Sequence, residues 1–222
     1  AANRSCRRAV ETRGIEDKQR CGRVRIVADR RSLKRYLAYY KGRGVLTHSP
    51  APGEIDIAQQ LNTLFGLRGI TPIGRLDKDS EGLLILSNDG RLTGPLLDPN
   101  AGHEKEYDVT VDKPINHWFL KHMAAGVIIE GYTTKPATIT PHPKNPRRFS
   151  LVLTEGKKHQ IRRMCAALGY QVQSLKRTRI MHITLGKLKP NQYRNLTPTE
   201  LHTLLDALGV KYQPPNANSN ST

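Results

Sequence analysis

Three carboxylates alternate with other residues in the stretch Asp77-Lys78-Asp79-Ser80-Glu81-Gly82, which ends on a glycine. Such a stretch can bind a cation, hold a catalytic carboxylate or form a solvated turn. A calcium loop of the EF type needs oxygen ligands at its first, third and fifth positions, glycine at the sixth and a bidentate Glu at the twelfth. Position twelve is Asn88 and position nine is Ile85, which disfavours calcium. On spacing alone, a solvated loop between two strands is the default reading.

Strands and helices are predicted around this loop without regular βα alternation, which favours an α+β fold over a doubly wound one. Period-2 alternation and short apolar runs predict strands at 37–40, 45–46, 73–76, 83–87, 106–112 and 149–156. Helical spacing, caps and glycine stops predict helices at 56–65, 116–125 and 159–168, and from 197 onward. The last of these begins with the capping box Thr197-Pro198-Thr199-Glu200.

Periodicity also assigns the buried face of each element. Alternation in the strand over 106–112 puts Tyr107, Val109 and Val111 on one face. The helix over 56–65 buries a second apolar face, made of Ile57, Leu61 and Leu64. The helix over 159–168 buries a third, made of Ile161, Met164, Cys165 and Leu168.

The charge balance points to a polyanionic partner. Lys and Arg number 36 against 19 Asp and Glu, which leaves a net charge of +17. Nucleic acid is the usual partner of such a surplus. An anionic membrane is disfavoured because no strongly amphipathic basic helix is evident. The cysteines Cys6, Cys21 and Cys165 have no metal-ligand spacing, so we expect reduced thiols, a cytoplasmic location and no bound metal.

Composition divides the chain into three parts. Residues 1–36 are expected to form a basic arm that includes a short strand candidate at 23–27. Residues 37–209 have the recurring apolar and polar residues typical of a packed domain. Residues 210–222 are rich in Pro, Asn and Ser, which predicts a disordered tail.

Four motifs in order carry a resemblance to a known family. "GRLDKDSEGLLILSNDG" (74–90) resembles the signature of the pseudouridine synthases of the bacterial RsuA/RluB/RluE/RluF branch, close to G-R-L-D-x-x-[ST]-x-G-L. "HEKEYDVTVDKP" (103–114), "LTEGKKHQIRRMCAALGYQVQSLKRTRI" (153–180) and "YRNLTPTEL" (193–201) resemble the later motifs of that branch, and details within them are closest to the RluF type.

The resemblance implies an isomerase that converts a uridine within RNA to pseudouridine, with no cofactor. It implies a mixed, mostly antiparallel sheet flanked by helices. Large-subunit (23S) rRNA is the implied substrate, with a tRNA as the alternative, and we expect a monomer. A non-catalytic RNA-binding or ribosome-assembly protein on the same fold is the alternative function.

The motif positions imply roles for individual residues. Asp77 is expected to attack C1′ of the ribose or to remove the C2′ proton, Tyr107 to stack on the target base, and Arg162 to form an ion pair with Asp77. Expected RNA contacts are Arg75, Lys105, Lys157, Lys158, Arg163 and Ile180. Asp79 and Glu81 are expected to position Asp77, and Gly82 to serve backbone conformation or the close approach of RNA.

Two departures from the family pattern concern the N-terminal side. The usual N-K-P-x-G reads here Lys41-Gly42-Arg43-Gly44, without the proline. Most members carry an S4 RNA-binding module before the catalytic domain, and about 36 residues are too few for a complete one. We therefore expect residues 1–36 to be an arm or a remnant of that module.

Overall fold

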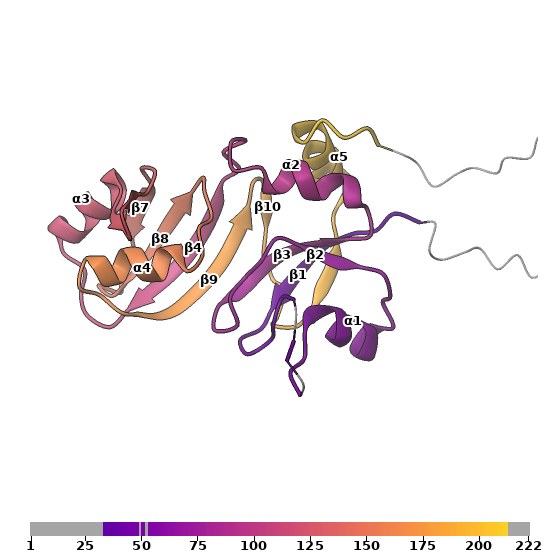
Figure 1. The fold of residues 1–222 in the computed structure, drawn as a ribbon, viewed down its shortest axis with the longest axis horizontal. Helices are drawn as coiled ribbons and strands as arrows, with labels where there is room; N and C mark the ends of the chain where they lie inside the picture. The colour runs from indigo at the N-terminus through magenta and orange to yellow at the C-terminus, as the bar shows by residue number, and fades with distance from the viewer. Residues whose placement is uncertain (1–32, 49, 52, 213–222) are drawn as a thin grey trace, which may run out of the picture. The chain divides into compact units, whose positions relative to one another are not determined.

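A computed structural model describes residues 33–48, 50–51 and 53–212 of the chain, and its centre is a nine-stranded sheet (Figure 1). The strand order is β11-β1-β3-β9-β4-β8-β7, with β2 beside β3 and β10 beside β9. β3 and β9 pair in parallel, and the other described pairings are antiparallel. The strands are β1 (Tyr36–Lys41), β2 (Thr71–Ile73), β3 (Glu81–Ser87), β4 (Lys105–Val111), β7 (Thr138–Pro141), β8 (Arg148–Leu153), β9 (Val172–Ile180), β10 (Ile183–Thr184) and β11 (Tyr193–Asn195).

Three of the described helices start at side-chain caps. The helices are α1 (Ile57–Phe65), α2 (Thr93–Leu97), α3 (His117–Ala125), α4 (Gln160–Ala167) and α5 (Pro198–Ala207), and a 3₁₀ turn spans Gly90–Leu92. Asp56 caps α1, Asn116 caps α3, and Thr197 with Glu200 forms the capping box of α5, whereas α2 and α4 start without a side-chain cap. A separate hairpin pairs β5 (Ile128–Ile129) with β6 (Tyr132–Thr133). This mixed sheet with separate helices confirms the α+β class.

The sheet separates two apolar clusters. Leu37 and Tyr39 of β1 pack with α1, α3 and α4 in the first cluster, whereas Ala38 and Tyr40 pack with α2 and α5 in the second. β3 divides in the same way, with Leu84 in the first cluster and its neighbours in the second. Because both faces of these strands are covered, they read in the sequence as continuous apolar runs.

β4 is covered on one face only. Tyr107, Val109 and Val111 are buried in the first cluster, as predicted, and the alternate residues are half-buried and polar. On that polar face the Asp108 carboxylate is paired with Arg148 of β8 and the Glu106 carboxylate with Arg179 of β9.

β9 is the longest of the described strands that the sequence does not predict; the others are the short strands β5, β6, β7, β10 and β11. It lies between β3 and β4 at the middle of the sheet, although it carries Lys176, Arg177 and Arg179. These charged side chains interrupt the alternation of apolar and polar residues that would predict a strand. They are tolerated there because their partners come from elements distant in the chain: Arg179 pairs with Glu104 and Glu106.

Three local predictions are wrong. Leu64 is 56% exposed, because the last turn of α1 extends beyond the core. The strand predicted at 73–76 ends at Ile73, where Gly74 takes a left-handed conformation (φ 86°) and turns the chain into a loop. The strand predicted at 45–46 is reduced to a single parallel bridge between Leu46 and Asp56.

The terminal predictions fall almost wholly outside the described residues. Of the arm at 1–36 only 33–36 are described, and of the tail at 210–222 only 210–212, while the strand candidate at 23–27 lies outside. In the described part of the chain, no helix has the length and apolar content needed to cross a membrane. Cys165 is a buried free thiol whose pKa burial raises to about 12.

Candidate active site

The loop between β2 and β3, residues 74–80, surrounds a lysine side chain. The Lys41 ammonium, fully buried at the end of β1, donates to the carbonyls of Gly42 (3.0 Å), Lys78 (3.3 Å) and Ser80 (2.8 Å). Burial lowers the pKa of Lys41 to about 8, and the charges of Asp77, Asp79 and Glu81 oppose this shift. The carboxylates of Asp77, Asp79 and Glu81 thus lie around the buried ammonium of Lys41, a cation that the protein itself supplies.

The three carboxylates do not converge on a common point. Glu81 accepts a hydrogen bond from the Tyr40 hydroxyl at 2.8 Å, and Asp77 faces His159. Among the described residues, no group of three or more His, Cys, Asp and Glu side chains is placed to hold a metal ion. The structure therefore gives no support to the calcium hypothesis.

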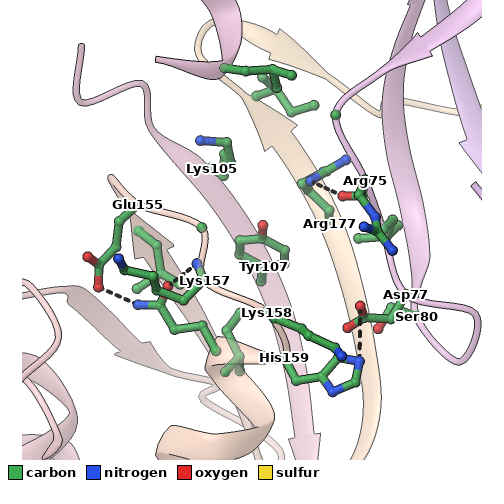
Figure 2. Close-up of a pocket in the computed structure, with 18 of the residues that line it drawn as sticks. Arg75, Asp77, Ser80, Lys105, Tyr107, Glu155, Lys157, Lys158, His159 and Arg177 are labelled. Atoms are coloured by element: carbon green, nitrogen blue, oxygen red, sulfur yellow. Dashed lines mark hydrogen bonds and ion pairs between the residues drawn. The ribbon is translucent and has the colours of Figure 1, made fainter. Parts of the chain in front are cut away.

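Asp77 lies against a histidine. Nε2 of His159 is 3.3 Å from Oδ1 of Asp77, and both side chains are partly exposed (Figure 2). His159 is the residue before α4 and has a left-handed backbone (φ 51°). A non-glycine residue rarely adopts this conformation outside functional or tightly constrained sites.

Arg162 lies near Asp77 in the chain fold but does not form the expected ion pair with it. From the first turn of α4 its guanidinium donates to the carbonyls of Val172 (3.2 Å) and Asp79 (3.3 Å) and to Ser80 Oγ (3.4 Å). These three oxygens occupy the guanidinium, and His159 holds the place beside the carboxylate. Arg162 thus supports the loop of Asp77 through its contacts to Asp79 and Ser80.

Asp77 opens onto a cavity of about 480 Å³ bounded by the β2–β3 loop, β4, β9, α2 and the loop between β8 and α4. Seven of the predicted residues line it, namely Arg75, Asp77, Lys105, Tyr107, Lys157, Lys158 and Ile180. Arg162 and Arg163 do not line it. Arg163 is paired with Glu130 and donates to the Lys158 carbonyl.

The floor of the cavity is formed by two adjacent strands. Tyr107 of β4, 8% exposed, pairs in register with Arg177 of β9 (Figure 2). The Arg177 guanidinium donates to the carbonyls of Leu83 (2.7 Å) and Arg75 (3.4 Å), and so ties the β2–β3 loop to the sheet. Ile180, 4% exposed, adds an apolar wall.

A buried glutamate fixes the loop that carries the lysines. Glu155 accepts from the Tyr132 hydroxyl (2.7 Å), from the Lys135 amide (3.1 Å) and from the Gln160 side chain. The Lys157 ammonium lies 4.6 Å from the centroid of the Tyr132 ring. These contacts hold the segment 155–160 against the β5–β6 hairpin.

Gly82 is required by a neighbouring strand. A Cβ at Gly82, where φ is 113°, would lie 2.3 Å from the Arg177 carbonyl oxygen. The positive φ agrees with the first of the two predicted roles, backbone conformation, and the close approach is that of β9, which pairs with β3 at this point.

Comparison with known proteins places this fold and cavity in a family. The RNA pseudouridylate synthase family matches residues 35–167. The chain belongs to this family.

Individual synthases agree with that placement. The dual-specificity RNA pseudouridine synthase RluF of Escherichia coli (strain K12) is 47% identical over 132 residues, which are 60% of this chain and 45% of the relative. The uncharacterized RNA pseudouridine synthase YtzG of Bacillus subtilis (strain 168) is 42% identical over 173 residues, 76% of this chain and 72% of the relative. The matched part of this chain thus spans less than half the length of RluF.

Solved structures of synthases share the fold. A crystal structure of a pseudouridylate synthase superposes with a TM-score of 0.70 at 31% identity, covering 78% of this chain and 74% of the other. Human RNA pseudouridylate synthase domain containing 1 superposes with a TM-score of 0.50 at 16% identity, over 81% of this chain and 93% of the other, which shows the fold alone.

Sequence reasoning missed three residues of this synthase site: Lys41, His159 and Arg177. His159 and Arg177 both fall inside motifs that identify the family, so their positions were visible but their contacts were not. Lys41 is the last residue of an apolar strand, and nothing in the sequence around it indicates that its ammonium is buried.

Proposed function

We propose that the chain isomerises a uridine in structured RNA to pseudouridine, with large-subunit rRNA as its substrate and a tRNA as the alternative. The observation that carries the proposal is Asp77 at the edge of a cavity walled by Tyr107 and by basic side chains. A cavity of about 480 Å³ lies in the range of pockets that bind small ligands, so it can receive one extruded nucleotide.

Asp77 acts on the ribose in this proposal. Its carboxylate attacks C1′ or removes the C2′ proton, and in both routes the glycosidic N1–C1′ bond breaks. The freed uracil rotates and its C5 bonds to C1′, which displaces Asp77 in the first route and is matched by return of the proton to C2′ in the second. C5 then loses its proton and N1 gains one. Because pseudouridine is an isomer of uridine, the reaction needs neither an oxidant nor a cofactor.

Tyr107 and Ile180 hold the base. The Tyr107 ring stacks on the target uracil, and stacking of a base on an aromatic side chain is worth about 1–3 kcal/mol. This offsets part of the cost of extruding a nucleotide, which is a few kcal/mol. Ile180 gives an apolar wall beside the base.

Exposed cations at the cavity mouth are proposed to bind the RNA backbone. Arg75, Lys157 and Lys158 line the cavity and are exposed, as phosphate contacts require. Arg163 is a further proposed contact beyond the mouth, where Glu130 competes for its guanidinium. Removal of each phosphate contact should reduce the slope of log binding constant against log salt by about 0.7–0.9.

Arg162 serves in this proposal by holding the Asp77 loop through Asp79 and Ser80. The protein acts as a monomer in the cytoplasm, where ribosomal RNA is found.

Tritium release from RNA labelled at C5 of uridine tests the proposal, because the new C–C bond expels that hydrogen. We expect release from protein-free large-subunit rRNA by the wild type and none by Asp77→Asn. Asp79→Asn is the matched control, since Asp79 lies in the same loop but does not line the cavity. Salt-sensitive RNA binding with no release by the wild type would favour the alternative of a non-catalytic RNA-binding protein.

A further inference from the structure

Two cations on the side of the cavity formed by β4 and β9 have no carboxylate partner among the described residues. Lys105 of β4 and Arg177 of β9 both line the cavity, and no described Asp or Glu forms an ion pair with either. Figure 2 shows them on the two sides of Tyr107, on neighbouring strands. Arg177 is buried and Lys105 is half-buried. A charge shielded from water without an opposite charge is costly, so the two cations together indicate a ligand of complementary charge.

Lys105 has spare hydrogen-bonding capacity. It lies two residues before Tyr107 on the same strand face, and its ammonium donates to the His103 carbonyl at 3.2 Å. An ammonium carries three donors. The Lys41 ammonium, by contrast, has three carbonyl acceptors supplied by the protein. Burial lowers the pKa of Lys105, and the charge of Arg177 adds to this effect.

Arg177 is held rigidly. It is 5% exposed, and its Nε and Nη1 are engaged by the Leu83 and Arg75 carbonyls. These contacts fix the plane of the guanidinium before substrate arrives. A charge fixed in advance stabilises a developing opposite charge without reorganisation during the reaction.

The proposed reaction develops an anion at this point. When the N1–C1′ bond breaks, its electron pair leaves with the base, and the negative charge is shared among N1, O2 and O4 of uracil. This holds whether Asp77 attacks C1′ or removes the C2′ proton. C5 of the same anion then bonds to C1′, which displaces the Asp77 carboxylate in the first route and is matched by return of the proton to C2′ in the second. This step neutralises the ring, after which C5 loses its proton and N1 gains one.

We propose that Lys105 and Arg177 form an anion site that holds the departing uracil during its rotation. The inference rests on the proposed synthase function and gives Lys105 a part in catalysis in place of a contact to backbone phosphate. Phosphates of a bound strand stay at the surface, where Arg75, Lys157 and Lys158 are exposed to meet them. The side of the cavity formed by β4 and β9 then receives the base.

Lys105→Met tests the site, because it removes the charge and keeps the length of the side chain. We expect its single-turnover rate at saturating RNA to fall about 100- to 1000-fold, with the dissociation constant for RNA changed less than threefold. Lys105→Arg should recover part of the rate, since it restores a cation. The matched control Lys121→Met, at an exposed position of α3 that does not line the cavity, should leave the single-turnover rate unchanged.

A leaving-group series gives a second readout that a structural defect would not produce. The N1 of 5-fluorouracil is more acidic than that of uracil, so its anion needs less stabilisation. The rate loss in Lys105→Met should therefore be smaller on RNA with 5-fluorouridine at the target than on the uridine RNA, with the rearranged nucleoside quantified by mass spectrometry. Equal losses on the two RNAs would overturn the inference.

The outcomes separate this inference from the proposed function. A wild-type protein that is inactive on every RNA tested would refute both. An active wild type with an equally fast Lys105→Met would refute the anion site alone. If Lys105→Met fails to fold, Lys105→Gln takes its place, and a lower affinity for RNA with an unchanged rate at saturation would assign Lys105 to phosphate binding.

Discussion

His159 and Asp77 face each other across the gap between the start of α4 and the β2–β3 loop, with 3.3 Å between Nε2 and Oδ1. The left-handed backbone of His159 aims the imidazole at the carboxylate. Arg162, three residues further on, binds the backbone of the same loop. The N-terminal end of α4 thus contacts both the side chain of Asp77 and the loop that carries it.

Replacement of His159 should therefore slow the reaction without unfolding the protein. The contact joins two partly exposed groups, and an ion pair of this kind contributes about 0.2–1 kcal/mol. We therefore expect His159→Ala to lower the single-turnover rate about two- to fivefold. His159→Gln, which retains a donor, should lose less. His117→Ala, at an exposed position of α3, is the control and should have no effect. A His159→Ala rate equal to that of the wild type would show that the contact is unimportant.

Lys41→Met should destabilise the Asp77 loop. It leaves the carbonyls of Gly42 and Ser80 without their buried donor, whereas the Lys78 carbonyl still accepts from the Gly44 amide. Unsatisfied buried polar groups cost about 1–3 kcal/mol each. We expect urea unfolding to show a loss of about 2 kcal/mol, with lower activity in the folded fraction.

Lys78→Met is the control for Lys41, since Lys78 lies in the same loop and pairs only with Glu54 at the surface. Exposed ion pairs contribute about 0–1 kcal/mol. Similar losses in both variants would mean that the loop does not depend on the internal cation.

Gly82→Ala should be among the most damaging small substitutions. It combines a left-handed conformation with a Cβ that would lie 2.3 Å from the Arg177 carbonyl oxygen, so we expect about 2–5 kcal/mol of destabilisation. Gly90→Ala, where nothing lies within 4 Å, should change stability by less than about 0.5 kcal/mol. Thermal unfolding of the two variants measures the difference, and a stable Gly82→Ala would disprove the tight β3–β9 approach.

Stability should fall in acid because of two carboxyls away from the cavity. Arg194 lowers the pKa of Glu200 from 4.5 to about 2, and Arg91 holds the pKa of Asp89 well below its usual range. The unfolded chain therefore binds protons first as the pH drops, and the free energy of unfolding should decrease below about pH 4.5.

Glu200→Gln isolates one of these carboxyls. Its destabilisation relative to the wild type should be largest at pH 7 and should shrink as the pH falls from 4.5 towards 2, measured by urea unfolding at each pH. A difference that stays constant over this range would contradict the lowered pKa of Glu200.

Local signals in the sequence are enough for much of the frame. The apolar alternation of Tyr107, Val109 and Val111, the capping box at Thr197, and the run over 83–87 each reflect forces that act within a few residues. They predict the element and its buried face because burial and capping repeat with the period of the strand or helix. Leu64 shows the limit, since its exposure depends on where the rest of the core ends.

The family motifs also determined which residues meet at the cavity, and seven of the predicted side chains line it. The sequence by itself thus determined the α+β class and the family, and it predicted two residues, Asp77 and Tyr107, that line the cavity. Tertiary structure alone decided what touches Asp77. His159 and Arg162 lie about 80 positions away in the chain, and their order around the loop depends on the geometry at the start of α4.

The same reason applies to the charges. Lys41, Arg177 and the strand β9 are stabilised by backbone carbonyls and carboxylates from distant segments. A charged residue in a sequence predicts exposure, because a buried charge is costly without partners. Only the folded chain brings those partners within hydrogen-bonding distance. The tertiary structure is therefore needed to tell a buried cation such as Lys41 from one that lines the cavity, such as Arg177, and from one at the surface, such as Lys78.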